Sequence, residues 1–260
     1  MSGLEREAAP LPETLIGRRD GALLRLTLNR PGSLNALDKA LYHALADALA
    51  AAEADDEIDA VLIDGAGESF CAGNDLHDFL AVGDRDEALA APRRLLEALA
   101  GFSKPLIARV QGHAVGIGTT LLLHCDLVLC RDDARFALPF TRLGLVPEGG
   151  SSLLLPGLVG HPRAFEWLVM GEPCDAEEAR RLGLVNAALP GEALDVAVER
   201  YLTRLLALPQ AAVRRSKALL RAPRREALAE VMHDELDAFA ERLASDEAQA
   251  ALRGMLEGRR

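Results

Sequence analysis

The sequence predicts an α/β fold with a helical C-terminal region. Strand and helix patterns alternate from Ala22 to Cys130, which is typical of βαβ units with parallel strands. After Pro156 helix patterns follow one another, and no strong strand pattern occurs after Asn186. The chain has 260 residues, half of them hydrophobic, so it can bury a substantial core. We therefore expect a core over residues 1–200 and a helical region over residues 201–260.

Composition narrows the functional classes. The formal charge of −11 disfavours nonspecific nucleic-acid binding, which needs a basic surface. The four cysteines lack the spacing of zinc ligands, which predicts no metal site and a reducing environment. The N-terminus lacks a secretory pattern, and the longest apolar runs are far shorter than a membrane span. We expect a cytoplasmic protein without nucleic-acid or membrane partners.

The first half of the chain provides the strands. Residues 1–15 contain two prolines and mixed charges, which predicts a loose lead-in. Alternating or continuous apolar patterns then predict four strands. The predicted strands are Ala22–Asn29, Ala60–Asp64, Pro105–Val110 and Cys125–Cys130. The predicted helices between them are Asn35–Ala54, with a leucine every fourth residue, Asp86–Leu99, which contains Pro92, and a helix that ends at His124.

The second half provides the helices. The predicted segments are His161–Met170, Asp175–Leu182, Gly191–Leu206, Pro209–Leu220, Arg224–Leu243 and Asp246–Leu256. Two basic groups, Arg214–Lys217 and Arg221–Arg225, are typical of solvated helix faces. An alternative is that they neutralise phosphate groups of a ligand.

Two glycine-rich turns each precede a helix, at Ala72–Asn74 and Gly116–Gly118. Such turns expose backbone N–H groups, and a helix N-terminus favours negative charge. One turn of this kind is weak evidence. If the fold brings both turns together, two N–H donors could form an oxyanion hole for charge that develops on a carbonyl oxygen.

Glu148 is the candidate acid–base residue. It lies between Pro147 and two glycines, Gly149 and Gly150, with apolar residues on either side of the motif. A carboxylate near an apolar interior is expected to have a raised pKa and to exchange protons near neutral pH. The alternative is a turn that opens a helix, in which Glu148 stabilises the N–H groups of the first turn.

Other polar residues fit structural roles better. We expect a structural, hydrogen-bonding role for His113, packing or a solvent-facing position for His124, and a structural anchor in Asp126. Ser151 and Ser152 lack a plausible His–Asp relay, which disfavours a serine hydrolase.

These motifs together resemble the crotonase, or enoyl-CoA hydratase/isomerase, superfamily over nearly the whole chain. Five segments carry the resemblance in the family's order and spacing. They are Leu28–Pro31 with Asn35–Leu37, Phe70–Leu76 (FCAGNDL), Gln111–Gly118 with Cys125-Asp126, Pro139–Ser152 around Glu148, and Gly171–Pro173 with Gly183–Asn186. The sequence around Glu148 resembles the 3,2-trans-enoyl-CoA isomerases of the peroxisomal type.

The resemblance implies a crotonase-like spiral of ββα units and a C-terminal helical region used for assembly into trimers or dimers of trimers. It implies an acyl-CoA thioester substrate, with no cofactor because coenzyme A is part of the substrate. The backbone N–H groups of Asn74 and Ile117 would hold the thioester oxygen. The residues implied in substrate binding are Arg30, Ala72, Gly73, Asp75, Leu76, Gly116 and Phe140.

The sequence departs from the hydratases of this superfamily at two positions. Hydratases use two glutamates to activate a water molecule, and this chain has Thr120 and Phe140 there. Glu148 instead matches the single catalytic glutamate of the isomerases. We therefore expect proton transfer from C2 to C4 of a 3-enoyl-CoA through Glu148. The alternatives are a hydratase or another acyl-CoA-processing enzyme of this fold, and a catalytically silent acyl-CoA-binding subunit.

Overall fold

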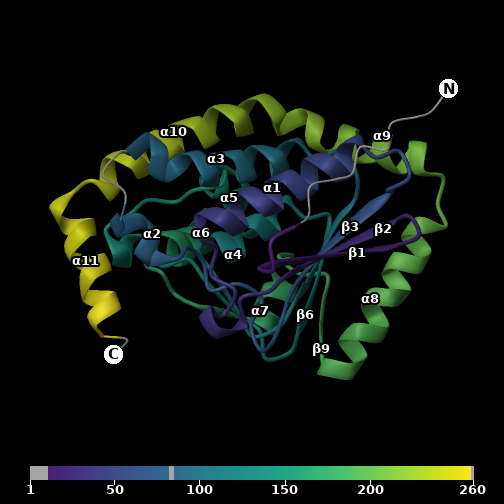
Figure 1. Cartoon of the computed structure of the whole chain (residues 1–260), viewed down its shortest axis with the longest axis horizontal. Coiled ribbons are helices and arrows are strands. Elements are labelled where there is room, and N and C mark those ends of the chain that lie inside the picture. The colour runs from purple at the N-terminus through teal and green to yellow at the C-terminus, as the bar shows by residue number, and fades with distance from the viewer. Residues whose placement is uncertain (1–10, 82–84, 259–260) are drawn as a thin grey trace.

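The computed structural model describes residues 11–81 and 85–258. Its main sheet has six strands in the order β1-β2-β3-β4-β6-β9 (Figure 1). They are β1 (Leu15–Asp20), β2 (Leu23–Leu28), β3 (Ala60–Gly65), β4 (Leu106–Val110), β6 (Leu127–Arg131) and β9 (Ala187–Leu189). β1 pairs antiparallel with β2, and the remaining neighbours pair parallel, as the alternating pattern predicts.

A second sheet of three short strands lies near the glycine-rich turns. It contains β5 (His113–Val115), β7 (Arg135–Ala137) and β8 (Cys174–Asp175), in that order. β5 and β7 run parallel, so the segment that leads to Gly116 is fixed beside Phe136 at the centre of β7. The sequence patterns did not predict these strands, because two or three residues are too few to show alternation.

The helices fill the intervals and the C-terminal region. The α-helices are α1 (Lys39–Ala54), α2 (Leu76–Ala81), α3 (Arg85–Gly101), α4 (Ile117–Thr120), α5 (Ser151–Val159), α6 (His161–Leu168), α7 (Ala176–Arg181), α8 (Gly191–Leu206), α9 (Gln210–Arg221), α10 (Arg225–Leu243) and α11 (Asp246–Glu257). Short 3-10 helices are η1 (Pro31–Ser33), η2 (Leu121–His124), η3 (Thr141–Leu143) and η4 (Ala222–Arg224). No helix in the described part of the chain has the length and apolar character needed to cross a membrane.

Both faces of the main sheet are covered, which explains its continuous apolar strands. Val61 and Ile63 of β3 belong to the larger core with α1 and α3, whereas Leu62 packs on the opposite face under α8. The α8 side of the second core consists of Leu194, Ala197, Val198 and Leu202. α8 therefore closes one face of the sheet, and it spans the predicted boundary between residues 200 and 201.

The C-terminal helices pack on the core. α10 runs along α3 at the top of the view in Figure 1, and α11 contacts α2 and η3. The predicted helical C-terminal region is confirmed. This packing brings residues from the end of the chain beside the turn that contains Glu148.

One predicted helix start is wrong, and two strands of the main sheet were not predicted. The first helix starts at Lys39, since Asn35 has a left-handed φ of 58° and the Asp38 carboxylate accepts the Leu41 N–H at 2.8 Å as an N-cap. β1 lies between the lead-in and the first predicted strand. It is a charged edge strand with only Leu15 buried, so it shows no alternation of apolar and polar residues. β9 follows Asn186, and its three residues give only a weak strand pattern.

Lys217 of α9 is buried in the core. Its Nζ donates to Asp126 Oδ2 and to the Lys104 carbonyl oxygen, both at 2.6 Å. The Leu106 N–H also donates to Asp126 Oδ2, at 2.8 Å. Asp126 is therefore a structural anchor, as predicted, that joins α9 to the main sheet.

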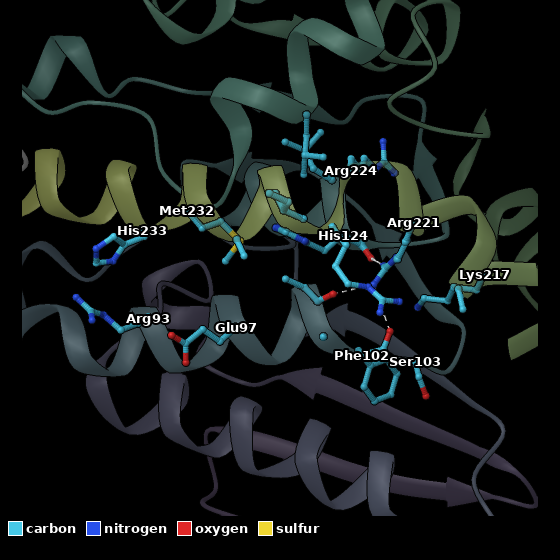
Figure 2. A pocket seen from close by; sticks show the side chains of 18 of the residues that line it. Arg93, Glu97, Phe102, Ser103, His124, Lys217, Arg221, Arg224, Met232 and His233 are labelled. Atoms are coloured by element: carbon cyan, nitrogen blue, oxygen red, sulfur yellow. Dashed lines mark hydrogen bonds between the residues drawn. The ribbon is translucent and has the colours of Figure 1, made fainter. Parts of the chain in front are cut away.

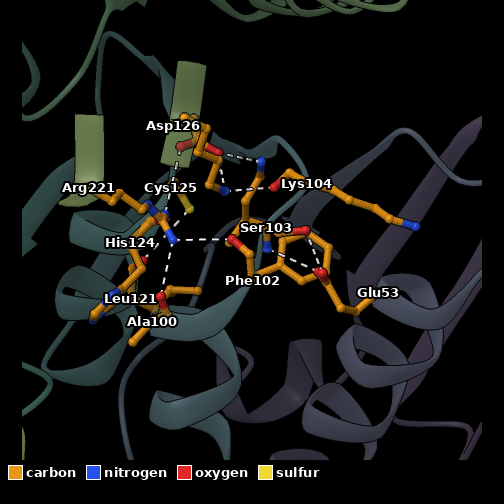
Figure 3. A network of polar contacts seen from close by, with 12 residues as sticks. Glu53, Ala100, Phe102, Ser103, Lys104, Leu121, His124, Cys125, Asp126 and Arg221 are labelled. Atoms are coloured by element: carbon orange, nitrogen blue, oxygen red, sulfur yellow. Dashed lines mark hydrogen bonds and ion pairs between the residues drawn. The ribbon is translucent and has the colours of Figure 1, made fainter. Parts of the chain in front are cut away.

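Arg221 at the end of α9 also serves the fold. Its guanidinium donates to the carbonyl oxygens of Ala100 at 3.3 Å and Phe102 at 3.2 Å, and to that of His124 (Figure 3). Removing these donors would leave partly buried carbonyl groups without partners. The prediction of solvated faces is wrong for Lys217 and Arg221, whereas Arg224 and Arg225 are exposed.

Asn35 connects two loops near the first glycine-rich turn. It is fully buried, its Oδ1 accepts the Arg30 N–H at 2.9 Å, and its Nδ2 donates to the carbonyl oxygens of Ala66 at 2.9 Å and Ser69 at 2.7 Å. These bonds fix the loop that leads from β3 to Phe70.

We expect Asn35→Ala to lower the free energy of unfolding by more than about 2 kcal/mol, because it removes three buried hydrogen bonds and leaves alanine at a positive φ. Urea unfolding measures this change. Ser33→Ala, at an exposed position in the same turn, is the control and should change stability by less than about 0.5 kcal/mol. Equal effects of the two substitutions would contradict the role of Asn35.

Candidate active site

The two glycine-rich segments lie side by side. The Cys71 N–H donates to the His113 carbonyl oxygen at 3.0 Å, and the Val115 N–H donates to the Cys71 carbonyl oxygen at 2.9 Å. Gly73 has a φ of 95°, and a Cβ there would lie 2.9 Å from the Val115 carbonyl oxygen. Only glycine fits this close approach. The structure thus brings the first turn against the second.

The backbone N–H of Asn74 points away from its neighbouring strand. The Leu37 N–H donates to the Gly73 carbonyl oxygen at 2.8 Å, and the Asp75 N–H donates to the Leu37 carbonyl oxygen at 2.9 Å. In a parallel pairing of this form, the residue between the two bonding groups directs its own N–H to the opposite side. Asn74 is that residue, and it is half-buried.

Ile117 is the first residue of α4, so its N–H has no partner within that helix. The helix start packs against the first turn, since a Cβ at Gly118 would lie 2.5 Å from the Cys71 carbonyl oxygen. A Cβ at Gly116 would meet no atom within 4 Å. The N-terminal end of α4 is therefore close to Cys71 and has open space beside Gly116.

Glu148 lies at the other end of α4. Its side chain is buried, with Thr120 at the last position of α4 donating its hydroxyl to Glu148 Oε1 at 2.5 Å. Gly149 and Gly150 follow with φ of 72° and 74°, and α5 starts at Ser151. Glu148 therefore precedes a helix, as the alternative interpretation predicted, but its carboxylate is directed to Thr120 on another helix.

Burial, and to a smaller extent the negative charge of Glu235, raise the pKa of Glu148 to about 8, although the hydrogen bond from the Thr120 hydroxyl opposes the shift. Two other ionisable groups near it, Cys71 and His124, stay neutral near pH 7. Burial raises the pKa of Cys71 to about 12 and lowers that of His124 to about 4. The site therefore holds a carboxylic acid that exchanges its proton near neutral pH, as its apolar neighbours predicted.

Tyr42 is a site residue that the sequence patterns did not identify. Its hydroxyl donates to Asn74 Oδ1. Burial, and then the charges of Glu148 and Cys71, raise the pKa of Tyr42 well above its usual value. Tyr42 thus connects α1 to the first turn and lies near Glu148. Tyr42 lies beside Leu41 in the leucine pattern of this helix, and that pattern gives no sign of a polar role.

Residues 18–260 match the family described as enoyl-CoA hydratase/isomerase. The chain belongs to this family. It is also similar to the solved structure of Pseudomonas aeruginosa OdaA, at 44% identity and a TM-score of 0.89, over 94% of this chain and 99% of that one. The crotonase resemblance and its α/β fold class are confirmed.

Named relatives of this family member include isomerases and hydratases. It is 37% identical to human enoyl-CoA delta isomerase 2 over 92% of this chain, and 32% identical to crotonyl-CoA hydratase of Syntrophomonas wolfei over 95% of this chain and 96% of that protein. The chain spans 62% and 61% of the length of the human and rat isomerases that it matches. The named relatives therefore include both activities.

A cavity of about 530 Å³ lies between α3 and α10 of this family member (Figure 2). Its apolar lining includes Leu123, Leu154, Leu228, Met232 and Leu236. Arginines 93, 221, 224 and 225, together with Lys217, give its wall a basic character. The cavity thus combines an aliphatic surface with cationic groups.

The cavity adjoins the turn that contains Glu148. His124 lines the cavity, and its Nε2 donates to the Gly149 carbonyl oxygen at 2.8 Å. A Cβ at Gly150 would lie 2.3 Å from Leu228 and 3.3 Å from Met232. His124, treated above as packing or solvent-facing, is buried and holds the turn.

The remaining predicted residues have clear places. Arg30 binds Asp75 at 3.0 Å, Asp38 at 3.2 Å and the Ala36 carbonyl oxygen at 2.5 Å, so it fixes the first turn to the start of α1. Ala72, Gly73 and Leu76 lie in the same turn, with Leu76 opening α2. Phe140 is buried in the main core directly before η3. By contrast, His113 is exposed on β5.

The pH dependence of stability tests the burial of Glu148. Its folded-state pKa of about 8 exceeds the ordinary glutamate pKa of 4.5, so the native state retains a proton that the unfolded chain releases. Its contribution to stability is complete below about pH 4.5 and is lost as the pH rises to about 8. In that window the parent should lose up to about 1.4 kcal/mol per pH unit relative to Glu148→Gln.

Urea unfolding of both proteins between about pH 5 and about pH 9 measures the difference. Glu230→Gln, at an exposed position on α10, should follow the parent curve. A difference between parent and Glu148→Gln that stays constant with pH would contradict a raised pKa at Glu148.

Proposed function

We propose that this protein isomerises 3-enoyl-CoA thioesters to trans-2-enoyl-CoA thioesters, with Glu148 as the single acid–base residue. The observation that supports this proposal most is one buried acid with a pKa of about 8, placed at the end of a short helix that begins at Ile117. Isomerisation moves one proton between two carbons, so one group that both accepts and returns a proton is sufficient.

In this proposal the thioester carbonyl binds between the N–H groups of Asn74 and Ile117. The coenzyme A part lies along Arg30, Ala72, Gly73, Asp75 and Leu76, with the open space at Gly116 accommodating the thioester. The adjacency of the two turns and the directions of their N–H groups support this arrangement. Two such donors would stabilise the oxygen that gains negative charge during the reaction.

The chemical steps follow from the position of the acid. The ionised Glu148 carboxylate takes a proton from C2, whose C–H bond is weakened by the carbonyl group and the adjacent double bond. The electron pair moves to the thioester oxygen and forms a dienolate, which the two N–H groups stabilise. The carboxylic acid then returns the proton to C4, and the double bond moves from C3–C4 to C2–C3. No atom is gained or lost.

The neighbourhood of Glu148 supports isomerisation over hydration. A hydratase needs a second acid to position water, whereas Thr120 carries a hydroxyl that is already bonded to Glu148. Phe140, at the other position, is an apolar residue buried in the core. Exclusion of water around the dienolate would protect it from side reactions.

The cavity is the proposed site of the acyl chain beyond C4. One continuous segment, α4 and η2, runs from Ile117 through Thr120 to His124 on the cavity wall. A substrate with its thioester at Ile117 and its C2–C4 atoms at Glu148 therefore has its remaining carbons on the side of the cavity. The aliphatic residues of α5 and α10 suit such a chain.

For assembly we propose a homotrimer or a dimer of trimers. Large apolar side chains are exposed near the end of α6, at Phe165, Val169 and Met170, and at Leu219 and Leu220 of α9. Such surfaces are typical of contacts between subunits.

The activity test compares 3-hexenoyl-CoA with 2-hexenoyl-CoA. We expect the parent to isomerise the first and to hydrate the second poorly, and Glu148→Gln to lower kcat on the first by on the order of 100- to 10,000-fold. Ultraviolet absorbance of the conjugated thioester measures the reaction, and the exposed Glu230→Gln is the control. Efficient hydration by the parent, activity that survives Glu148→Gln, or binding without turnover would each contradict the proposal.

Chain length tests the assignment of the cavity. Ala229 is exposed at the cavity wall, so Ala229→Trp should obstruct it, whereas Ala227→Trp places the same side chain on α10 outside the lining. We expect Ala229→Trp to lower kcat/KM for a twelve-carbon 3-enoyl-CoA about 10-fold and to leave the six-carbon substrate nearly unchanged. Equal losses for both substrates, or for both variants, would contradict the assignment.

A further inference from the structure

Glu235 of α10 binds the backbone directly after Glu148. Its Oε2 accepts the Gly150 N–H at 2.6 Å, and its Oε1 accepts the Ser152 N–H at 2.8 Å. The side chain is buried, although carboxylates rarely are unless they are paired. Both partners are backbone donors at the start of α5, which is separated from Glu235 by more than eighty residues of sequence.

The start of α5 depends on this distant carboxylate. The N-cap residue is Gly150, which has no side chain to bond the first N–H groups of the helix. The local Ser151 hydroxyl donates to the Glu148 carbonyl oxygen at 2.7 Å and so does not accept from these N–H groups in that bond. Glu235 therefore performs from α10 the function that an N-cap side chain usually performs locally.

Packing around the same turn leaves little freedom. Gly150 adjoins Leu228 and Met232 of α10, and Gly149 lies beside Thr120 and Leu96. The turn is thus held by α10 on one side and by α3 and α4 on the other. A shift of α10 would move the backbone from which Glu148 projects.

We propose that Glu235 is a positioning residue for the acid–base reaction: it fixes the turn that carries Glu148 and places a second negative charge beside it. This inference rests on the proposed role of Glu148. Glu235 is assigned no contact with the substrate. It acts through the two N–H groups and through its charge.

The electrostatics agree with the geometry. The charge of Glu235 raises the pKa of Glu148, and burial raises the pKa of Glu235 itself. The other ionisable groups around the turn are Tyr42 on α1, Cys71 in the first turn and His124 on η2, and all three stay uncharged near pH 7.

The charged groups that line the cavity in the described part of the chain do not bond to the Glu148 turn. α3 contributes Arg93 and Glu97 to the cavity wall, and α10 contributes Arg225 and His233, which pairs with Asp237 at 3.6 Å. The other cations of the wall are Lys217 and Arg221 of α9 and Arg224 of η4. These groups have no hydrogen bond to the Glu148 turn among the described residues. Neutralising Glu235 is therefore the most direct change of charge at Glu148 that leaves Glu148 itself intact.

The experiment compares Glu235→Gln and Glu235→Ala with the parent on 3-hexenoyl-CoA as a function of pH. Glu235→Gln keeps the side-chain volume and one acceptor oxygen but removes the charge, so the inflection of kcat/KM assigned to Glu148 should move to lower pH. Glu235→Ala removes both acceptors and should lower kcat on the order of 10- to 100-fold through displacement of the turn. KM should change less than about threefold in both variants.

Asp234→Asn is the matched control, because Asp234 is an exposed carboxylate one residue away on α10. Its kcat and pH profile should match the parent. Size-exclusion chromatography and circular dichroism establish that each variant is folded before the assay.

The outcomes separate this inference from the proposed function. If Glu148→Gln retains isomerase activity, the role of Glu148 fails, and the inference about Glu235 fails with it. If Glu148→Gln is inactive but Glu235→Gln has the parent pH profile, only the inference about Glu235 fails. A Glu235→Gln protein that cannot be recovered folded would also overturn it, because the residue would then be needed for folding rather than for positioning.

Discussion

Burial of the Glu148 carboxylate is the constraint on which the site depends. A buried carboxylate without a cation partner is costly in its charged form, so its pKa rises until the group is largely protonated at neutral pH. The Thr120 hydroxyl partly offsets this cost by donating to the carboxylate. In the proposed reaction, this balance lets the carboxylate accept a proton from carbon and lets the resulting carboxylic acid return it. A salt bridge at this position would remove that property by stabilising the charged form.

The same constraint explains how the fold surrounds the acid. α4 joins the N–H of Ile117 to Thr120 within four residues, so the proposed oxyanion site and the base are connected by one rigid turn of helix. The first glycine-rich turn packs against the start of α4, and the Glu148 turn packs against its end. α10 then closes the second side through Glu235, Leu228 and Met232. The C-terminal region thus packs directly against the turn that contains Glu148.

Local sequence patterns identified the glycine-rich turns and the acid of the candidate site. Glycine-rich turns at Ala72–Asn74 and Gly116–Gly118, and the acid between Pro147 and Gly149, are visible because backbone geometry demands particular residues there. Amphipathic helices such as α8 were located to the residue for the same reason, since a long periodic pattern is a strong signal. β1 was not predicted, because it depends on pairing at the edge of the sheet. The first residue of α1 was not predicted either, because it depends on the capping hydrogen bond of Asp38.

Tyr42 and Glu235 could not have been found by such patterns. Each lies within a regular helix, where its residue type fits the helix pattern and gives no separate signal. Each acquires its role from a hydrogen-bond partner that is distant in sequence. The Tyr42 hydroxyl donates a hydrogen bond to the Asn74 side chain. Glu235 accepts the Gly150 N–H, which it reaches because α10 packs along α3. A buried polar side chain in the tertiary structure is the signal that reveals them, since such groups need partners.

The neutral residue at position 120 also supports the proposed use of one acid rather than two. Thr120 donates a hydrogen bond to Glu148, whereas an ionised carboxylate at that position would accept only. Glu235 already contributes one negative charge near Glu148, so a further acid at position 120 would face two carboxylates in a buried space. Like charges in such a space cannot all ionise, and one pKa would rise strongly. Glu148 thus has a hydroxyl donor, Thr120, bonded to its carboxylate and a fixed carboxylate, Glu235, bonded to the backbone of its turn. This arrangement fits a single proton carrier better than a pair of acids that share a water molecule.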